Sequence, residues 1–165
     1  MKVLILGATS AIAQAYARRR AANGADFVLA GRREDRLAAI AADLSACGAG
    51  STEMIISDLA AIDTIEAQVR EMRARFGEPD EVVIAYGVLG QQATAERDLL
   101  EARALMDSNF TSAALWILAL LKEKPDAHKL TIIGIGSVAG DRGRASNFIY
   151  GSAKAALDQI GRAHV

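Results

Sequence analysis

The fold is decided by residues 3–13, which read VLILGATSAIA. Four consecutive apolar residues, 3–6, are typical of a short strand that is buried on both faces. Small residues follow, and Ser10 is placed to cap a helix that runs to about Ala22. The free N–H groups and partial positive charge of a helix N-terminus bind phosphate when no bulky side chain blocks the approach. The turn therefore indicates a phosphate cradle, although a turn that only packs a helix against a strand has a similar composition.

The same alternation of short apolar runs and helical patterns continues along the chain. Strands are predicted at residues 3–6, 27–30, 54–56, 82–85 and 130–135. Helices are predicted at residues 10–22, 34–47, 62–76, 95–123 and from 148 onward, the fourth one bent near residues 107–109. Because the strands are rich in Val, Ile and Leu and alternate with helices, right-handed crossovers give an α/β fold with a doubly wound parallel sheet. One domain is expected, covering residues 1–165.

Composition argues against several classes of protein and partner. Of the 165 residues, 52% are hydrophobic and 24% are charged, and the net charge of −1 indicates no nucleic-acid or membrane-surface partner. Cys47 is the only cysteine, so no internal disulfide can form, and a cytoplasmic location is expected. The longest later apolar stretch, 113–121, is too short to span a bilayer, and the opening run 3–6 is too short for a signal peptide. His128 and His164 have no partners at ligand spacing, so no metal site is predicted.

The end of the second predicted strand bears on the choice of nucleotide. NAD-binding folds carry an acidic residue there that bonds the ribose 2′-OH, whereas a 2′-phosphate requires that carboxylate to be absent and an arginine to be near. Here Gly31 takes the place of the acid, and Arg32 and Arg33 follow. The pattern favours NADP(H) over NAD(H) as the cofactor. The alternative is that the two arginines are only the charged entry to a helix.

A third motif points to proton transfer. Tyr150 and Lys154 are four residues apart on a predicted helix, so they share one face. An ammonium group beside a phenol stabilises the phenolate form, which makes Tyr150 a workable acid and base. Ser137 stands at the end of the fifth strand. It can hydrogen-bond a substrate oxygen there, because ligands of such sheets bind beyond the carboxyl ends of the strands.

Together these motifs resemble those of the short-chain dehydrogenase/reductase family, in its short, non-extended branch. The resemblance extends over essentially the whole chain and implies a Rossmann fold with strand order 3-2-1-4-5. It implies an NADP(H)-dependent oxidoreductase that transfers a hydride between the cofactor and a carbonyl or alcohol substrate, and it makes a homo-oligomer expected. The implied catalytic residues are Asn109, Ser137, Tyr150 and Lys154. The implied cofactor-binding residues are Gly7, Thr9, Ser10, Ala11, Ile12, Gly31, Arg32, Arg33, Asp58, Leu59, Gly87, Tyr150 and Lys154.

Each of these roles follows from the resemblance. Tyr150 is expected to supply or remove the hydroxyl proton, and Ser137 to orient and polarise the carbonyl. Lys154 is expected to bind the nicotinamide ribose as well, and Asn109 to hold a helix bend and a water next to the lysine. Asp58 is expected at the adenine edge, although an Asp in that position is also a good helix N-cap.

The chain departs from the family pattern in two places. Ala11 and Ala13 stand where the glycine-rich turn usually has glycine, and residues 84–87 read IAYG where the family commonly has Asn-Asn-Ala-Gly. The bracing that the asparagines supply must come from elsewhere, and Tyr86 is either a wall of the substrate pocket or a packing residue. These departures leave room for an alternative, a nucleotide-binding protein of the same fold that does no chemistry. A nucleotide-sugar epimerase or dehydratase of the extended branch is disfavoured because the usual glycine spacing of that branch does not match residues 7, 10 and 13.

The resemblance also bears on the end of the chain. Members of the family usually continue with sixth and seventh strands and a substrate lid, so the chain is expected to be truncated at its C-terminus. Gly161 is expected to interrupt the helix of Tyr150, and residues 160–165 are expected to be non-native, with a translated sequencing adapter as the hypothetical source. A chain cut in this way is expected to expose its fifth strand as a sheet edge, to bind NADP(H) weakly and to turn over little substrate.

Overall fold

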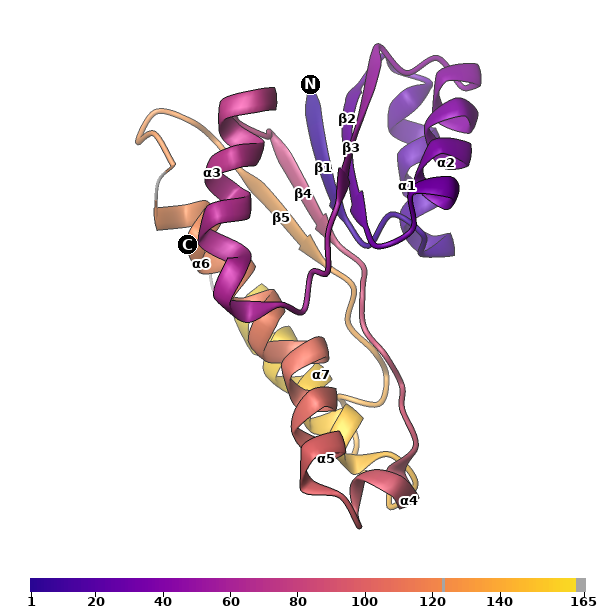
Figure 1. Ribbon diagram of the computed structural model, residues 1–165, viewed down its shortest axis with the longest axis vertical. Helices are drawn as coiled ribbons and strands as arrows, with labels where there is room; N and C mark the ends of the chain where they lie inside the picture. Colours follow the sequence, from indigo (N-terminus) through magenta and orange to yellow (C-terminus); the bar gives the residue numbers. More distant parts are fainter. Residues whose placement is uncertain (123, 163–165) are drawn as a thin grey trace.

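The computed structural model describes residues 1–122 and 124–162 and contains a five-stranded parallel sheet. The sheet order is β3-β2-β1-β4-β5, which confirms the predicted doubly wound α/β fold of Rossmann type (Figure 1). The strands are β1 Lys2–Leu6, β2 Asp26–Gly31, β3 Ser51–Ile56, β4 Glu81–Ile84 and β5 Thr131–Gly134. Leu6 pairs with Ala30 and with Ile84, and Ile84 pairs with Gly134, so the carboxyl ends of neighbouring strands lie together.

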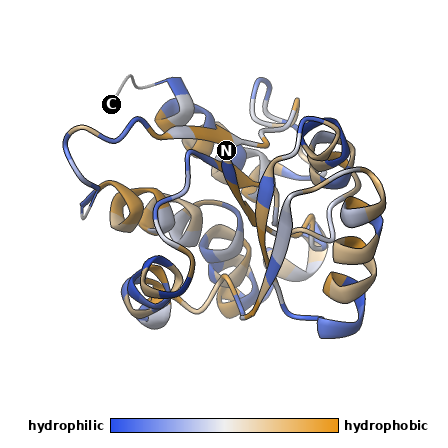
Figure 2. Ribbon diagram, turned by 90° about the horizontal axis from the view of Figure 1, so that it is seen from above, coloured by the Kyte–Doolittle hydropathy of each residue, from blue (hydrophilic) through white to orange (hydrophobic). Residues whose placement is uncertain are grey.

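Helices cover both faces of the sheet, as Figure 1 and Figure 2 show. One face is covered by α1 Ala11–Ala21 and α2 Glu34–Ala46, and the other by α3 Ile65–Phe76, α6 Ser112–Lys122 and α7 Phe148–Arg162. The shorter elements are the 3-10 turn η1 Ile62–Thr64, helix α4 Gln92–Ala95, helix α5 Leu99–Met106 and the π-helical turn η2 Asp107–Thr111. Helices α4 and α5 and the first turns of α7 extend beyond the carboxyl ends of β4 and β5 (Figure 1).

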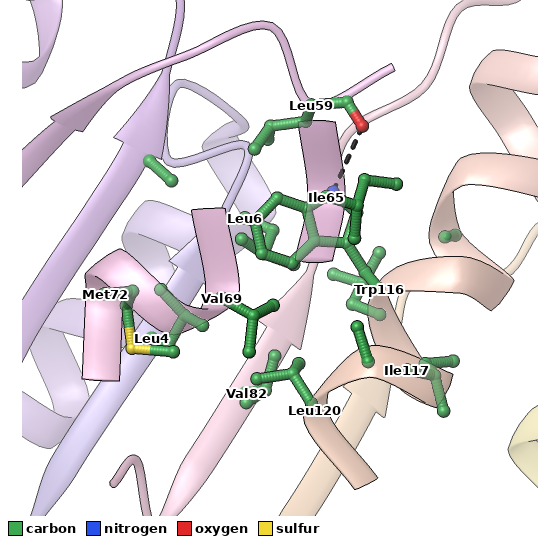
Figure 3. Close-up of a cluster of buried hydrophobic side chains, with 14 of the residues drawn as sticks. Leu4, Leu6, Leu59, Ile65, Val69, Met72, Val82, Trp116, Ile117 and Leu120 are labelled. Carbon is green, nitrogen blue, oxygen red and sulfur yellow. Dashed lines mark hydrogen bonds between the residues drawn. The ribbon is translucent and has the colours of Figure 1, made fainter. Parts of the chain in front are cut away.

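The alternation of side chains along β1 produces two hydrophobic cores. Leu4 and Leu6 lie in the core that contains Trp116, and Val3 and Ile5 lie in the core against α1 and α2. All five side chains are at most 2% exposed. Burying a large apolar side chain contributes about 1.5–3 kcal/mol, so both faces of the central strands stabilise the fold. Figure 3 shows the first core, where the sheet meets α3 and α6 through Leu59, Ile65, Val69, Met72, Val82, Ile117 and Leu120.

The edge strands differ from the prediction that every strand is buried on both faces. β3 contains only exposed and half-buried residues, and the side chain of Ile56 is 50% exposed. β5 is exposed at both of its ends and, within the described residues, pairs only with β4. The prediction is wrong for these two strands because a strand with one neighbour in the sheet is covered less completely than a central strand.

The long helical region departs from the predicted pattern in its first part and matches it at the bend. Ala95 belongs to the separate helix α4, and α5 begins only at Leu99, where the Asp98 carboxylate accepts the N–H of Leu100 at 2.9 Å. The predicted bend is the π turn η2, which joins α5 and α6 into one continuous helix, Leu99–Lys122. A π turn inserts one extra residue into the helix and frees backbone carbonyls, so it is a place where side chains enter the hydrogen-bond ladder.

This continuous helix is long and apolar enough to cross a membrane, judged by length and composition alone. Its residues Trp116, Ile117 and Leu120 are buried against the sheet, as those of a core helix are.

The predicted interruption at Gly161 is wrong. Helix α7 runs through Gly161 to Arg162, and nothing lies within 4 Å of the place where a Cβ on Gly161 would be. Glycine costs only about 1 kcal/mol in a helix interior, so the neighbouring residues carry the helix past it. Residues 163–165 of the segment predicted to be non-native lie outside the described residues.

Candidate functional site

A cavity of about 380 Å³ opens at the carboxyl ends of the strands. Its walls come from the segments that follow β1, β2, β3 and β4, together with one residue of η2. The cavity is lined by Gly7, Thr9, Ser10, Gly31, Arg32, Ser57, Asp58, Leu59, Ala60, Ala85, Tyr86, Gly87, Val88 and Ser108. Most of the predicted cofactor-binding residues are in this set. Five predicted cofactor-binding residues are not in it, namely Ala11, Ile12, Arg33, Tyr150 and Lys154, and the side chain of Ile12 is 59% exposed. The predicted catalytic residues Asn109 and Ser137 do not line the cavity either.

The turn after β1 needs glycine for a close backbone approach. Gly7 has a φ of +90°, and a Cβ there would lie 2.7 Å from the backbone nitrogen of Tyr86, closer than real Cβ atoms come. Its N–H and that of Ala8 donate to the carbonyl of Ala30, at 3.0 and 3.2 Å. Ser10 is the N-cap of α1, as predicted. The first turn thus packs against both β2 and the segment after β4, which fixes one end of the cavity.

The two arginines after β2 have different surroundings. Arg33 forms an ion pair with Asp35 at 2.7 Å, and the hydrogen bond from Arg33 holds the pKa of Asp35 below its usual value. Arg32 lines the cavity, is exposed, and makes no ion pair or hydrogen bond with the described residues. Of the two guanidinium groups, that of Arg32 remains for an anionic ligand.

The wall after β3 is formed by Asp58 and its neighbours. The Asp58 carboxylate accepts the N–H of Ala60 at 3.1 Å, while the N-cap of η1 is Ala61, so the alternative that Asp58 caps the following helix is wrong. The carbonyl of Leu59 accepts the indole N–H of Trp116 at 3.1 Å (Figure 3). This wall is therefore attached to α6 as well as to the sheet.

Asn109 lies in the π turn η2, is 1% exposed, and uses its whole amide. Its Nδ2 donates to the carbonyls of Leu105 at 2.8 Å and Val88 at 2.7 Å, and its Oδ1 accepts the N–H of Val88 at 3.1 Å. A Cβ on Gly87 would overlap Asn109 Oδ1 and lie 3.5 Å from Lys154 Nζ. Gly87 is thus the place where the asparagine and the lysine meet on the rim of the cavity.

Lys154 is buried in α7 with 5% of its surface exposed. Its Nζ donates to the carbonyl of Ile135 at 3.1 Å and lies 6.0 Å from the centroid of the Tyr150 ring. Burial lowers the pKa of Lys154, because the charged ammonium loses water, and the Asp158 carboxylate opposes this. Tyr150 is half-buried, and its hydroxyl makes no hydrogen bond with any described residue. The phenol is therefore available to a ligand.

Glycines bring the segment of Ser137 onto the helix of Tyr150. A Cβ on Gly151 would lie 2.6 Å from the carbonyl of Ala139, and one on Gly140 would lie 2.8 Å from the backbone nitrogen of Ala155. The Ser137 hydroxyl accepts the N–H of Ala139 at 3.2 Å. The backbone after β5 therefore touches the backbone of α7 on either side of Lys154.

Three residues with a place at the site were not predicted from the sequence. Gln92 in α4 accepts the N–H of Ile149 at 3.2 Å, one residue before Tyr150, and so satisfies a free donor in the first turn of α7. Ser112 and Trp116 hold the cavity walls through bonds to Tyr86 at 3.0 Å and to the segment after β3. No local pattern points to these contacts, because their partners lie 26 to 57 residues away along the chain.

Comparison with known proteins agrees with this architecture. The sequence model of the family described as short chain dehydrogenase matches residues 1–164. An uncharacterized oxidoreductase of Mycobacterium tuberculosis is 39% identical over 159 residues, which are 94% of this chain and 62% of that protein. A (5R,7aS)-5-hydroxy-7a-methyl-1-oxo-2,3,5,6,7,7a-hexahydro-1H-indene-carboxyl-CoA reductase of the same species is 34% identical, over 97% of this chain and 62% of the relative. The chain thus spans 62% of the length of these curated relatives.

Solved structures give the same result. A short chain dehydrogenase/reductase family protein superposes with a TM-score of 0.82 at 29% identity, over 98% of this chain and 66% of the other. The actinorhodin polyketide ketoreductase, solved with NADPH, superposes with a TM-score of 0.83 at 25% identity, over 96% and 61% of the two chains. Since the family model matches nearly every residue and the fold and relatives agree with it, the chain belongs to the short-chain dehydrogenase/reductase family of oxidoreductases.

Proposed function

We propose that this protein transfers a hydride between NADP(H) and a carbonyl or alcohol substrate, with Tyr150 as the general acid and base. The observation that carries the proposal is the meeting of Lys154 and Asn109 at Gly87, on the rim of a cavity whose other walls carry Arg32 and Asp58. A buried ammonium 6.0 Å from the centre of a phenol ring, close to the rim of a cavity, suits proton transfer to a bound carbonyl.

In this proposal the protein contributes positioning and charge. Tyr150 exchanges a proton with the substrate oxygen, and Ser137 hydrogen-bonds the same oxygen. The Lys154 ammonium stabilises the phenolate and reaches the nicotinamide ribose, and its burial makes this attraction stronger than it would be in water. Asn109 holds the segment after β4 in place through three hydrogen bonds from its side chain. The nicotinamide, when bound, supplies or accepts the hydride.

The preference for NADP(H) rests on Arg32. No carboxylate ends β2, where Gly31 stands, and the guanidinium of Arg32 borders the cavity without an ion pair to any described residue. A planar cation with several donors suits a 2′-phosphate. The neighbour that was solved with NADPH supports the same choice.

The names of the relatives support the reaction class and leave the substrate open. One curated relative is named an oxidoreductase and another a carboxyl-CoA reductase. Consumption of NADPH should be followed with a panel of ketones and aldehydes, comparing the unsubstituted chain with Tyr150→Phe, which keeps the ring and loses the hydroxyl. Carbonyl-dependent consumption that is lost in Tyr150→Phe would support the proposal, and measurable consumption at equal rates in the two proteins would contradict it. Tight NADPH binding without turnover would favour the alternative, a nucleotide-binding protein that does no chemistry.

A further inference from the structure

The cavity has two walls that are attached to the same helix. One wall is the segment after β3, residues 57–60, and the other is the segment after β4, residues 85–88. On α6, Trp116 donates its indole N–H to the Leu59 carbonyl at 3.1 Å (Figure 3), and Ser112 shares a hydrogen bond of 3.0 Å with the Tyr86 hydroxyl. Ser112 and Trp116 are four residues apart, so they lie on one face of the helix.

We infer that Tyr86, Ser112 and Trp116 are positioning residues, which hold the two walls of the nucleotide pocket at a fixed separation by attaching both to α6. The inference rests on the proposed function, because it takes the cavity to be the nucleotide site. It also gives Tyr86 a role at the site, since the tyrosine hydroxyl attaches the segment after β4 to Ser112.

Burial makes each of these bonds costly to lose. Ser112 is fully buried and Trp116 is 2% exposed, so a donor or acceptor left without its partner has no water to replace it. Burial raises the pKa of Tyr86 to about 12, so its hydroxyl stays protonated at neutral pH and keeps the bond to Ser112.

The wall after β4 also contacts other parts of the site. A Cβ on Gly7 would lie only 2.7 Å from the backbone nitrogen of Tyr86, so this wall is in close contact with the turn after β1. Two residues further on, Val88 is bonded to Asn109 at both its N–H and its carbonyl. The wall is therefore held at two points, by Ser112 and by Asn109, and only the second of these is a family catalytic position.

The test compares four variants of the 165-residue chain that each remove one hydrogen-bonding group: Tyr86→Phe, Ser112→Ala, Trp116→Phe and the control Tyr16→Phe. Tyr16 hydrogen-bonds Glu81 at the opposite end of β4, so the control loses a comparable hydroxyl away from the cavity. The dissociation constant for NADPH is measured by calorimetry, and the midpoint of thermal unfolding is measured alongside it.

The first three variants are expected to raise the Kd for NADPH by about three- to tenfold, as the loss of one neutral hydrogen bond does, while Tyr16→Phe leaves it unchanged. The double variant Tyr86→Phe/Ser112→Ala should bind no more weakly than either single variant, because both changes break the same bond.

The outcomes separate this inference from the proposed function. A merely structural role would lower the unfolding midpoint and leave the Kd of all four variants at the value of the unsubstituted chain, which would overturn the inference and leave the nucleotide site standing. If the unsubstituted chain bound neither NADPH nor NADH, the cavity would not be a nucleotide site, and both proposals would fall.

Discussion

Replacing Gly87 by alanine adds one carbon atom at the place where Asn109 and Lys154 come together, and so tests the packing of the site directly. The new Cβ would overlap Oδ1 of Asn109 and lie 3.5 Å from Nζ of Lys154. The Asn109 amide cannot swing aside freely, because it is 1% exposed and makes three hydrogen bonds of 2.7 to 3.1 Å. Alanine at this position is therefore expected to displace a side chain that the rest of the structure holds.

The size of the effect follows from three contributions. Overpacking a filled site costs about 1–3 kcal/mol. Loss of one Asn109 hydrogen bond adds about 1 kcal/mol. Gly87 also has a φ of +155°, where alanine is strained by about 1 kcal/mol or more, and this strain outweighs the gain from restricting the unfolded chain. The free energy of unfolding should fall by about 2–4 kcal/mol, which is a large part of the roughly 5–15 kcal/mol that stabilises a small domain.

Urea unfolding followed by circular dichroism measures this difference, and the chain offers a matched control. Nothing lies within 4 Å of the place of a Cβ on Gly143, so Gly143→Ala should change the free energy of unfolding by no more than about 0.5 kcal/mol. Equal stability of Gly87→Ala and Gly143→Ala would refute the reasoning, since the asparagine and the lysine would then not meet at Gly87.

Three further predictions address the cofactor, the lysine and the first turn of α7. Arg32→Gln should weaken binding of NADPH much more than that of NADH, while Arg33→Gln, which loses only an exposed ion pair, should change neither; calorimetric titration of both nucleotides checks this. The folded-state pKa of Lys154 lies below its ordinary value of 10.5, so between the two pKa values the unfolded chain binds more protons than the folded chain. The free energy of unfolding of the unsubstituted chain, relative to that of Lys154→Met, should therefore rise as the pH increases toward 10.5. Urea unfolding at a series of pH values measures this difference, and the absence of such a rise would contradict the burial of the lysine ammonium. Gln92→Ala should lower the free energy of unfolding by about 1 kcal/mol, because the N–H of Ile149 loses its acceptor, and an unchanged unfolding curve would count against that contact.

The sequence predicts the parts of the fold that depend on local patterns. Residues 3–13 contain a strand, a turn that needs Gly7 and a helix capped by Ser10, and all three are found. The parallel sheet and its order follow from the alternation of elements together with the family resemblance. The exposure of β3 and β5 could not be read from their apolar residues, since burial depends on neighbours in the sheet.

In the candidate site, too, features that depend on local spacing can be predicted and contacts between distant segments cannot. Tyr150 and Lys154 can be placed on one helix face from spacing alone, and Asn109 falls in a bend that the sequence predicts. The contacts of Tyr86 with Ser112 and of Gln92 with Ile149 join segments 26 and 57 residues apart, which no local pattern encodes. At Gly161 the low helix propensity of glycine predicts a break that is not found, because the surrounding residues of α7 continue the helix through it.

A crystal structure of this chain with NADPH tests the central claim most directly. It should show the 2′-phosphate at Arg32, a ribose hydroxyl within about 3.2 Å of Lys154 Nζ, and the hydroxyl of Tyr150 facing the nicotinamide. A nucleotide bound elsewhere, or a Tyr150 hydroxyl directed away from the nicotinamide with Lys154 out of reach of the ribose, would contradict the account.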